Sequence, residues 1–287
     1  MDKININDYL KQYLSDDVIY VPNPGNAGDS LIAHATYQVL DRLGINYQEG
    51  NLESIYENKI VFYGGGGNLV NPYTNALTFI ENNYSKVKKL VILPHTIRDY
   101  SNILSTLGKN VDLICREKES YKYVTQHATR ANIFVSDDLA FHTNVKKTID
   151  DGDAMFTSVD QFFIRNIKRN IRSSMYNTKN ILTNNILNSF RTDIEKTDII
   201  IPFNNIDISQ AFATDNMSKL YSHEAVYRIF KFIEKFNCVN TNRLHICIAS
   251  VLLGKEVNFY RNSYNKNYSI YEFSLHKKYN NVVFIDN

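Results

Sequence analysis

The stretch that decides the fold is Val18-Ile-Tyr-Val-Pro22, followed by the turn Gly25-Asn-Ala-Gly-Asp29 and a patterned run up to Gly44. The first five residues are mostly apolar and β-branched, which predicts a short buried strand. From Asp29 onwards apolar residues recur every three to four positions, which predicts a helix that Gly44 ends. A strand, a tight turn and a helix in this order are typical of an α/β fold.

Short apolar runs continue to alternate with helical stretches as far as residue 140, and the stretch 117–127 is one such helix. This alternation predicts a mainly parallel sheet, because each crossover helix returns the chain to the same edge of the sheet. Beyond residues 18–22, the predicted strands of the first half are 60–63, 90–93, 111–115 and 133–135.

The polar segment 143–158, which carries Asp150-Asp-Gly-Asp153, marks a boundary between two halves. The second half alternates again, with an amphipathic helix over 222–236 and a second helix over 244–253 that Gly254 ends. We therefore predict an α/β protein of two Rossmann-like domains, residues 1–150 and 151–287. The predicted strands of the second half are 161–165, 199–202, the segment around Val239, and 257–260.

Composition excludes several classes of protein. The 287 residues are 44% hydrophobic and 22% charged, as in ordinary globular proteins, and a net charge of +2 gives no general attraction to nucleic acid. Cys115, Cys238 and Cys247 are too widely spaced to indicate a zinc site or a disulfide framework. Without a signal-peptide pattern or a long apolar span, we expect a cytoplasmic protein.

The turn Asn26-Ala-Gly-Asp29 lies between a predicted strand and a predicted helix. In an open parallel sheet, ligands bind at the carboxyl ends of strands, where helix N-termini present unpaired N–H groups and a partial positive charge. This position favours an anion site that includes Asn26, Gly28 and Asp29. The alternative is that Asp29 only caps the helix.

Four consecutive glycines, Gly64 to Gly67, follow the strand 60–63. Ordering glycine costs about 0.5–1 kcal/mol relative to alanine, so the run indicates a place where the backbone approaches another group closely. The run has neither the phosphate-loop pattern nor the dinucleotide pattern, so it identifies no ligand. A tight strand-to-helix turn without a ligand is the alternative.

Three cations lie where strands end or helices begin. Arg116 follows the strand 111–115, although it could instead be a surface arginine paired with Glu117 or Glu119. Arg243 and His245 fall in the first turn of a predicted helix, where a cation opposes the helix dipole by about 0.3–1 kcal/mol. Two such cations together indicate an anion between them, since arginine matches carboxylate or phosphate and histidine can transfer a proton. A purely structural histidine is the alternative.

The polar loop 261–267 follows the strand 257–260 on the same predicted sheet edge. Its Lys266 could hold a further anionic oxygen, although the segment could also be an ordinary surface loop.

Taken in order, these motifs resemble those of the polysaccharide pyruvyl transferases over residues 18–273. Each motif is weak alone, but eight in register are specific. They are Asn26-x-Gly-Asp29, the Gly64 run with Asn68-Leu69, Leu93-Pro-His95, Cys115-Arg-Glu117 with Ser120, Asp137-Asp-Leu-Ala-Phe141, Thr241-Asn-Arg-Leu-His245, Leu253-Gly254 and Asn262-Ser-Tyr-Asn-Lys-Asn267.

The resemblance implies a glycosyltransferase-B-like fold with two domains facing a central cleft. It implies phosphoenolpyruvate as donor and the hydroxyl pair of a surface-glycan sugar as acceptor, with no metal or nucleotide cofactor and with a cyclic pyruvate ketal as product. The first domain would then face the acceptor and the second the donor. The implied catalytic residues are His245, Arg243 and Asp29, with His245 as general acid and with Asp29 or His95 as base.

The same resemblance assigns binding residues. The implied donor-binding residues are Arg116, Arg243, Leu244, His245, Asn262, Ser263 and Lys266. The implied cleft and acceptor residues are Asn26, Gly28, Gly65, Gly66, Asn68, His95, Arg98 and Asp137.

Two departures from the family pattern keep other functions open. The family motif Asp-Arg-Leu-His-Gly reads here with Asn242 and Ile246 at its ends, and His95 stands where the family often has Gln. Asn242 removes a carboxylate that could orient Arg243 or His245. A nucleotide-sugar glycosyltransferase of the same fold and an inactive binding member of a glycan-assembly complex therefore remain alternatives.

The segment 162–172 places Arg165, Lys168, Arg169 and Arg172 among apolar residues. Such a basic amphipathic stretch can lie on anionic lipid, which would suit a lipid-linked acceptor at the inner face of the membrane. The alternative is a core strand followed by a solvated basic helix.

Overall fold

The structure is a computed structural model that describes residues 2–156, 185–193, 198–262 and 266–286. The chain forms two compact units. Unit 1 comprises Met1–Pro24 and Ala35–His142, and unit 2 comprises Gly25–His34 and Thr143–Asn287. The predicted strand at 161–165 and the basic stretch at 162–172 lie outside the described residues.

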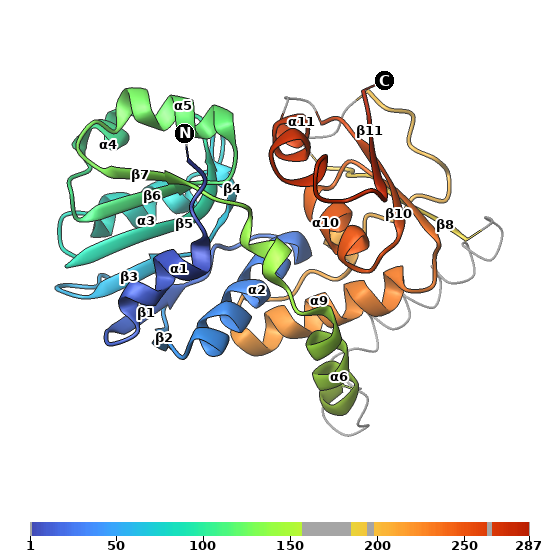
Figure 1. Cartoon of the computed structure of the whole chain (residues 1–287), viewed down its shortest axis with the longest axis horizontal. Coiled ribbons are helices and arrows are strands. Elements are labelled where there is room, and N and C mark those ends of the chain that lie inside the picture. Colours follow the sequence, from blue (N-terminus) through green and yellow to red (C-terminus); the bar gives the residue numbers. More distant parts are fainter. Residues whose placement is uncertain (1, 157–184, 194–197, 263–265, 287) are drawn as a thin grey trace. The chain divides into compact units, whose positions relative to one another are not determined.

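Unit 1 is built on a parallel sheet, drawn in blue to green in Figure 1. The first part of α2 (Ala27–Leu43), up to His34, is counted with unit 2, and α5 (Lys118–His127) packs against β5, β6 and β7. The strands run in the order β2 (Asn46–Glu49), β1 (Asp17–Val21), β3 (Ile60–Tyr63), β5 (Lys89–Ile97), β6 (Val111–Cys115) and β7 (Asn132–Val135). The remaining helices are α1 (Ile6–Leu10), α3 (Asn75–Asn83) and α4 (Ser101–Thr106), with 3-10 turns at Lys11–Tyr13 and Leu139–His142.

The glycine run connects two strands rather than a strand and a helix. After β3, the short strand β4 (Gly66–Leu69) pairs with the second half of β5, so the alternative of a strand-to-helix turn was wrong. Gly64 donates its N–H to the carbonyl of Val21 at 2.8 Å. A Cβ on Gly64 would lie 2.4 Å from the backbone nitrogen of Asn23, so only glycine lets the two chain segments pass this closely.

Unit 2 contains a second parallel sheet, drawn in yellow to red in Figure 1. Its strands run in the order β11 (Val282–Ile285), β10 (Glu256–Tyr260), β9 (Cys238–Thr241) and β8 (Ile186–Ser189). Its helices are α6 (Val145–Phe156), α8 (Ile208–Ala211), α9 (Lys219–Ile233), α10 (Leu244–Leu252) and α11 (Lys266–Ile270), and α11 continues into a π-helical turn at Tyr271–Leu275.

The predicted α/β class with parallel sheets is confirmed, and so are two helix ends. Gly44 and Gly254 have φ angles of 73° and 70°, the left-handed conformation that glycine adopts most easily after a helix. Within the described ranges, no helix combines the length and apolar character that crossing a bilayer requires.

Two predictions about the chain need correction. Residues 199–202 form irregular chain rather than a strand, and the side chain of Ile200 is 92% exposed, so an apolar run here does not mean burial. The units divide after His142 rather than at residue 150, because α6 packs against α9 of unit 2. Tyr227 on α9 donates a hydrogen bond of 2.7 Å to Asp153 on α6.

Candidate functional site

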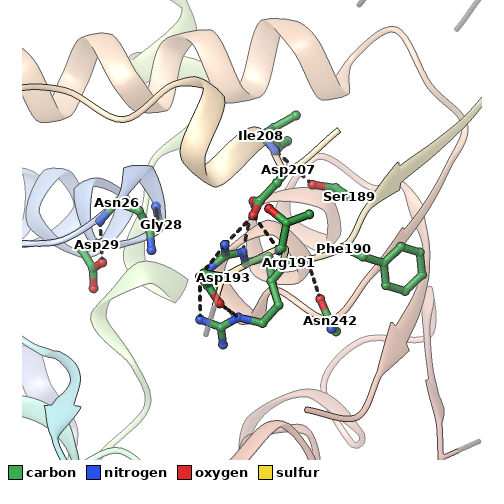
Figure 2. A network of polar contacts seen from close by, with 12 residues as sticks. Asn26, Gly28, Asp29, Ser189, Phe190, Arg191, Asp193, Asp207, Ile208 and Asn242 are labelled. Atoms are coloured by element: carbon green, nitrogen blue, oxygen red, sulfur yellow. Dashed lines mark hydrogen bonds and ion pairs between the residues drawn. The ribbon is translucent and has the colours of Figure 1, made fainter. Parts of the chain in front are cut away.

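Four charged residues of unit 2 form a connected group, which we call the arginine–aspartate network: Arg191, Asp193, Asp207 and Arg243. Arg191 and Asp193 follow β8, Asp207 directly precedes α8, and Arg243 is the N-cap of α10 just after β9. All four therefore lie near the carboxyl ends of neighbouring parallel strands, where α/β proteins bind ligands. Figure 2 shows Arg191, Asp193 and Asp207 gathered together beside Asn242.

Arg243 is held from two sides, and its side chain is only 5% exposed. Its Nε and Nη2 donate to the two carboxylate oxygens of Asp207 at 3.1 and 2.5 Å. The same Nη2 lies 2.8 Å from Oδ2 of Asp193. A buried guanidinium at a helix N-terminus costs free energy unless anions compensate it, and these two carboxylates do so.

Arg191 binds the other side of Asp193. Its Nε donates to Oδ1 at 2.9 Å and its Nη2 donates to Oδ2 at 3.2 Å. The carboxylate of Asp193 thus joins the two guanidinium groups. Sequence analysis missed Arg191, Asp193 and Asp207, because they belong to irregular chain with no period or motif to mark them.

Asn242 acts on Arg191 rather than on Arg243 or His245. Its side-chain oxygen accepts a hydrogen bond of 2.8 Å from the backbone N–H of Arg191. The carboxylate that Asn242 removes is not required to hold Arg243, because Asp207 and Asp193 do this. Ile246, the other departure from the family pattern, is fully buried in α10.

His245 lies against the start of α2, within the same unit. A Cβ on Gly28 would be 3.0 Å from Nδ1 of His245 and 3.1 Å from its Cβ. The histidine therefore packs directly on the glycine of the first helical turn. The two motifs that the sequence singled out, Asn26 to Asp29 and Arg243 to His245, lie side by side in unit 2.

Asn26 and Asp29 form a capping box at the N-terminus of α2 (Figure 2). The side-chain oxygen of Asn26 accepts from the N–H of Gly28 at 2.8 Å, and Oδ2 of Asp29 accepts from the N–H of Asn26 at 2.9 Å. Asp29 is therefore the third residue of the helix and not its cap, which corrects the alternative reading of this residue. Asp29 is half-buried.

The remaining predicted donor residues lie on α10 and around α11. Leu244 is buried as the first residue of α10, and Lys266 begins α11. Asn262 is 5% exposed and accepts a hydrogen bond of 3.2 Å from the N–H of Asn267, while its Nδ2 has no hydrogen-bond partner among the residues that the structure describes. Ser263 lies outside those residues.

Arg116 has an internal partner in unit 1. Its side chain is fully buried, Nη1 donates to Oδ2 of Asp138 at 2.7 Å, and Nε donates to Oγ1 of Thr96 at 2.8 Å. The alternative of a surface arginine paired with Glu117 or Glu119 was wrong, because β5, β6 and the chain after β7 enclose the side chain.

Predicted acceptor residues of unit 1 meet around Asn23, which sequence analysis did not single out. The amide oxygen of Asn23 accepts from Tyr63 Oη at 2.7 Å and from Asn68 Nδ2 at 2.9 Å. Nε2 of the fully buried His95 lies 2.9 Å from Oδ1 of Asn68. The glycine run was the signal in the sequence, since it predicted a close approach, and a Cβ on Gly66 would indeed be 2.5 Å from Nδ2 of Asn23.

Arg98 and Asp137 have other neighbours, and Gly65 lies buried between β3 and β4. Nη2 of Arg98 is 3.6 Å from Oε1 of Glu117, which caps α5. Asp137 pairs with Lys3 at 2.5 Å.

Other chemistries find less support. Burial raises the pKa of the Cys115 and Cys247 thiols, which keeps both protonated and unreactive at neutral pH. Among the described residues, no group of three or more His, Cys, Asp or Glu side chains is placed to hold a metal ion.

A cavity of about 440 Å³ opens on the sheet of unit 2. Its polar lining consists of Asn188, Asn240, Asp198 and Arg261. The aromatic rings of Phe190 and Tyr260, whose centroids are 5.0 Å apart, also line it. Amides, aromatic rings and one carboxylate are groups that orient polar ring-shaped ligands.

The fold and site together define a class: an α/β protein with two parallel sheets and an arginine–histidine site at paired helix N-termini. Residues 26–264 match the family model for polysaccharide pyruvyl transferase, and the chain belongs to that family. The match includes both the Asn26 turn and the Arg243–His245 motif.

A solved structure supports the fold. The chain is 32% identical to a functionally uncharacterised protein from Klebsiella pneumoniae subsp. pneumoniae NTUH-K2044, with a TM-score of 0.78. The alignment covers 98% of this chain and 97% of that one. No curated protein matches the chain at a significant level.

Proposed function

We propose that this protein transfers the enolpyruvyl group of phosphoenolpyruvate to two hydroxyls of one sugar in a surface glycan, forming a cyclic pyruvate ketal. Family membership over residues 26–264 supports pyruvyl transfer to a glycan. The observation that carries the donor assignment is the placement of Arg243 and His245 at the N-terminus of α10, against the start of α2. The N-terminus of α10 and a guanidinium suit a ligand that carries both a carboxylate and a phosphate.

The proposed chemistry assigns His245 as general acid. It delivers a proton to the methylene carbon of the donor, which generates an oxocarbenium-like centre at the carbon bearing the phosphate. One sugar hydroxyl attacks this carbon, the carbon–oxygen bond to phosphate breaks, and the second hydroxyl closes the ring. Of the two hydroxyl protons, one returns to His245, which gave its own proton to the methyl group. The other leaves with phosphate. Asp29 is the better placed base, because His95 is fully buried.

Arg116 enters this proposal in a different role. Arg116 is fully buried and forms an ion pair with Asp138. These features favour a structural role at the sheet edge of unit 1 over direct contact with the donor. The glycosyltransferase-B-like cleft, the lipid-linked acceptor and peripheral membrane contact stay predictions.

The reaction itself tests the proposal. Purified protein is mixed with phosphoenolpyruvate and a glycan acceptor, phosphate release is followed, and the glycan is examined by mass spectrometry for the ketal. We expect Arg243→Lys to lose activity by about 100-fold, since lysine cannot replace a bidentate fork. Arg228→Lys is the matched control, because Arg228 pairs along α9 with Glu224 at 2.9 Å, away from the arginine–aspartate network. Full activity of the Arg243 variant would refute its assignment.

A nucleotide-sugar glycosyltransferase is the second candidate, and the cavity over Asn188 and Asn240 is the observation that favours it. Its Asp198 carboxylate could hold ribose hydroxyls, and Tyr260 could stack on a base. Thermal shift distinguishes the two: stabilisation by sugar nucleotides, with none by phosphoenolpyruvate, would support this candidate and contradict the first.

A further inference from the structure

Asp193 is bound by two arginines in the way that arginines bind an anionic ligand. Its Oδ2 lies 2.8 Å from Nη2 of Arg243 and 3.2 Å from Nη2 of Arg191, and its Oδ1 accepts from Nε of Arg191 at 2.9 Å. Arg191 binds this carboxylate with its guanidinium fork and Arg243 adds a single Nη2 contact, an arrangement that arginines also use to recognise a carboxylate or phosphate ligand. Here a side chain of the protein takes that place.

Asp193 and Asp207 differ in how firmly the fold holds them. The Asp207 side chain is 6% exposed, binds two nitrogens of Arg243 and leads directly into α8. The Asp193 side chain is 28% exposed and lies in irregular chain. A carboxylate open to solvent can exchange with a dissolved anion, because leaving the arginine does not leave it buried and uncompensated. Asp207 therefore orients Arg243, whereas Asp193 is the exchangeable partner.

Charge leads to the same division of roles. Among the described residues, the two arginines and two aspartates of the network cancel, so these four side chains together offer an entering anion no net attraction. Removing Asp193 from the arginines releases one positive charge beside the N-terminus of α10, where the backbone N–H groups also favour an anion.

We infer that Arg191 and Arg243 form a single anion-binding site, that the Asp193 carboxylate occupies it as an internal ligand, and that a carboxylate or phosphate group displaces it. The identity of the natural anion rests on the proposed function, but the place of the site rests on geometry. This arrangement discriminates against small anions. A ligand with a second anionic group, which the N-terminus of α10 can hold, gains the additional free energy that displaces the aspartate.

Removing the internal competitor is the direct test. Asp193→Asn keeps the shape of the side chain and removes its charge, and we expect the Kd for inorganic phosphate to fall about tenfold. Adding Arg191→Gln should abolish that gain. The control is Asp151→Asn, which removes one negative charge from α6 of the same unit, where Asp151 forms an exposed ion pair with Lys147. Isothermal titration of the full chain gives each Kd, and Asp193→Ser is a second variant should the first fold poorly.

The outcomes separate this inference from the proposed function. Tighter phosphate binding in the Asp193 variants alone supports the inference even if no pyruvyl transfer occurs, in which case the proposed function fails. Unchanged or weaker phosphate binding in folded Asp193 variants overturns the inference. An equal gain in the Asp151 variant also overturns it, because the effect would then come from overall charge. Transfer that proceeds with an unchanged KM for phosphoenolpyruvate in the Asp193 variants would sink the inference and leave the proposed function standing.

Discussion

At the scale of single residues, arginines in both units are neutralised by carboxylates supplied from other segments. Arg243 pairs with Asp207 and Asp193, and Arg116 pairs with Asp138. These pairs differ in exposure: both members of the Arg116–Asp138 pair are fully buried, whereas Asp193 reaches solvent. Burial predicts that removing one member of the first pair is costly and that the Asp193 pair can change partners.

Breaking the buried pair of unit 1 should be costly, and replacing it as a whole should not. We expect Asp138→Ala to lower the free energy of unfolding by about 3–5 kcal/mol, because Arg116 is left as an uncompensated buried charge. The double variant Arg116→Met with Asp138→Leu should cost much less. Urea unfolding measures both. Glu119→Ala, which breaks only an exposed pair with Lys122, is the control and should change stability by less than about 1 kcal/mol.

If the single and double variants of this pair lost the same stability, the charge of Arg116 would not be the cause. The loss would then come from packing around position 138.

A buried histidine in unit 2 should make stability depend on pH. Nε2 of His34 lies 2.9 Å from Oγ1 of Thr148, and its ring stacks on His223 with centroids 4.8 Å apart. Burial, with His223 adding to it, lowers the pKa of His34 to about 3. The unfolded chain, with an ordinary pKa of about 6.5, binds the proton more readily, so this group's contribution is complete above about pH 6.5 and is lost as pH falls toward 3.

His34→Gln keeps a nitrogen near the Nε2 position and removes this titration. Between pH 7 and pH 5, we expect the free energy of unfolding to fall by about 2 kcal/mol more in the wild type than in the variant. Urea unfolding at each pH measures this fall. Parallel pH curves for the two proteins would contradict the assignment.

At the scale of elements, the glycine run fixes how β3 continues into β4. We expect Gly64→Ala to destabilise unit 1 by at least about 2 kcal/mol, because a Cβ 2.4 Å from the Asn23 nitrogen forces backbone to move. Gly44→Ala is a matched control with a positive φ but nothing within 4 Å of the added atom, and it should cost only about 1 kcal/mol. Thermal unfolding compares the two. Equal losses would show that the close approach is not what requires glycine at position 64.

Elements with strong local patterns were predictable. The strands at 60–63 and 111–115 appear with those same bounds, since each is a continuous apolar run between polar turns. Strand β2 was not predicted, because it is mostly exposed and its sequence is polar. Residues 199–202 were wrongly predicted as a strand, because apolar composition alone does not show burial.

The candidate site was predictable only in part. Arg243 and His245 stood out because cations at a helix start oppose the dipole. The partners of Arg243 did not, since Asp193 and Asp207 are far from it in sequence and belong to no periodic element. The packing of His245 on Gly28 likewise depends on tertiary structure, which joins motifs from opposite ends of the chain.

At the scale of the whole molecule, the chain keeps the family's order of motifs over residues 26–264 and two parallel sheets, one in each unit. Asn242 and Ile246 depart from the family motif without disturbing Arg243, because the carboxylates that hold it come from elsewhere in unit 2. These departures therefore do not argue for an inactive protein.

The most direct test of the central claim is a crystal structure of the protein with phosphoenolpyruvate bound. The account predicts the donor's anionic groups at hydrogen-bonding distance from the guanidinium groups of Arg243 and Arg191, beside His245, with the Asp193 carboxylate moved off both arginines. Donor density elsewhere, with the contacts between Asp193 and the two arginines unchanged, would contradict it.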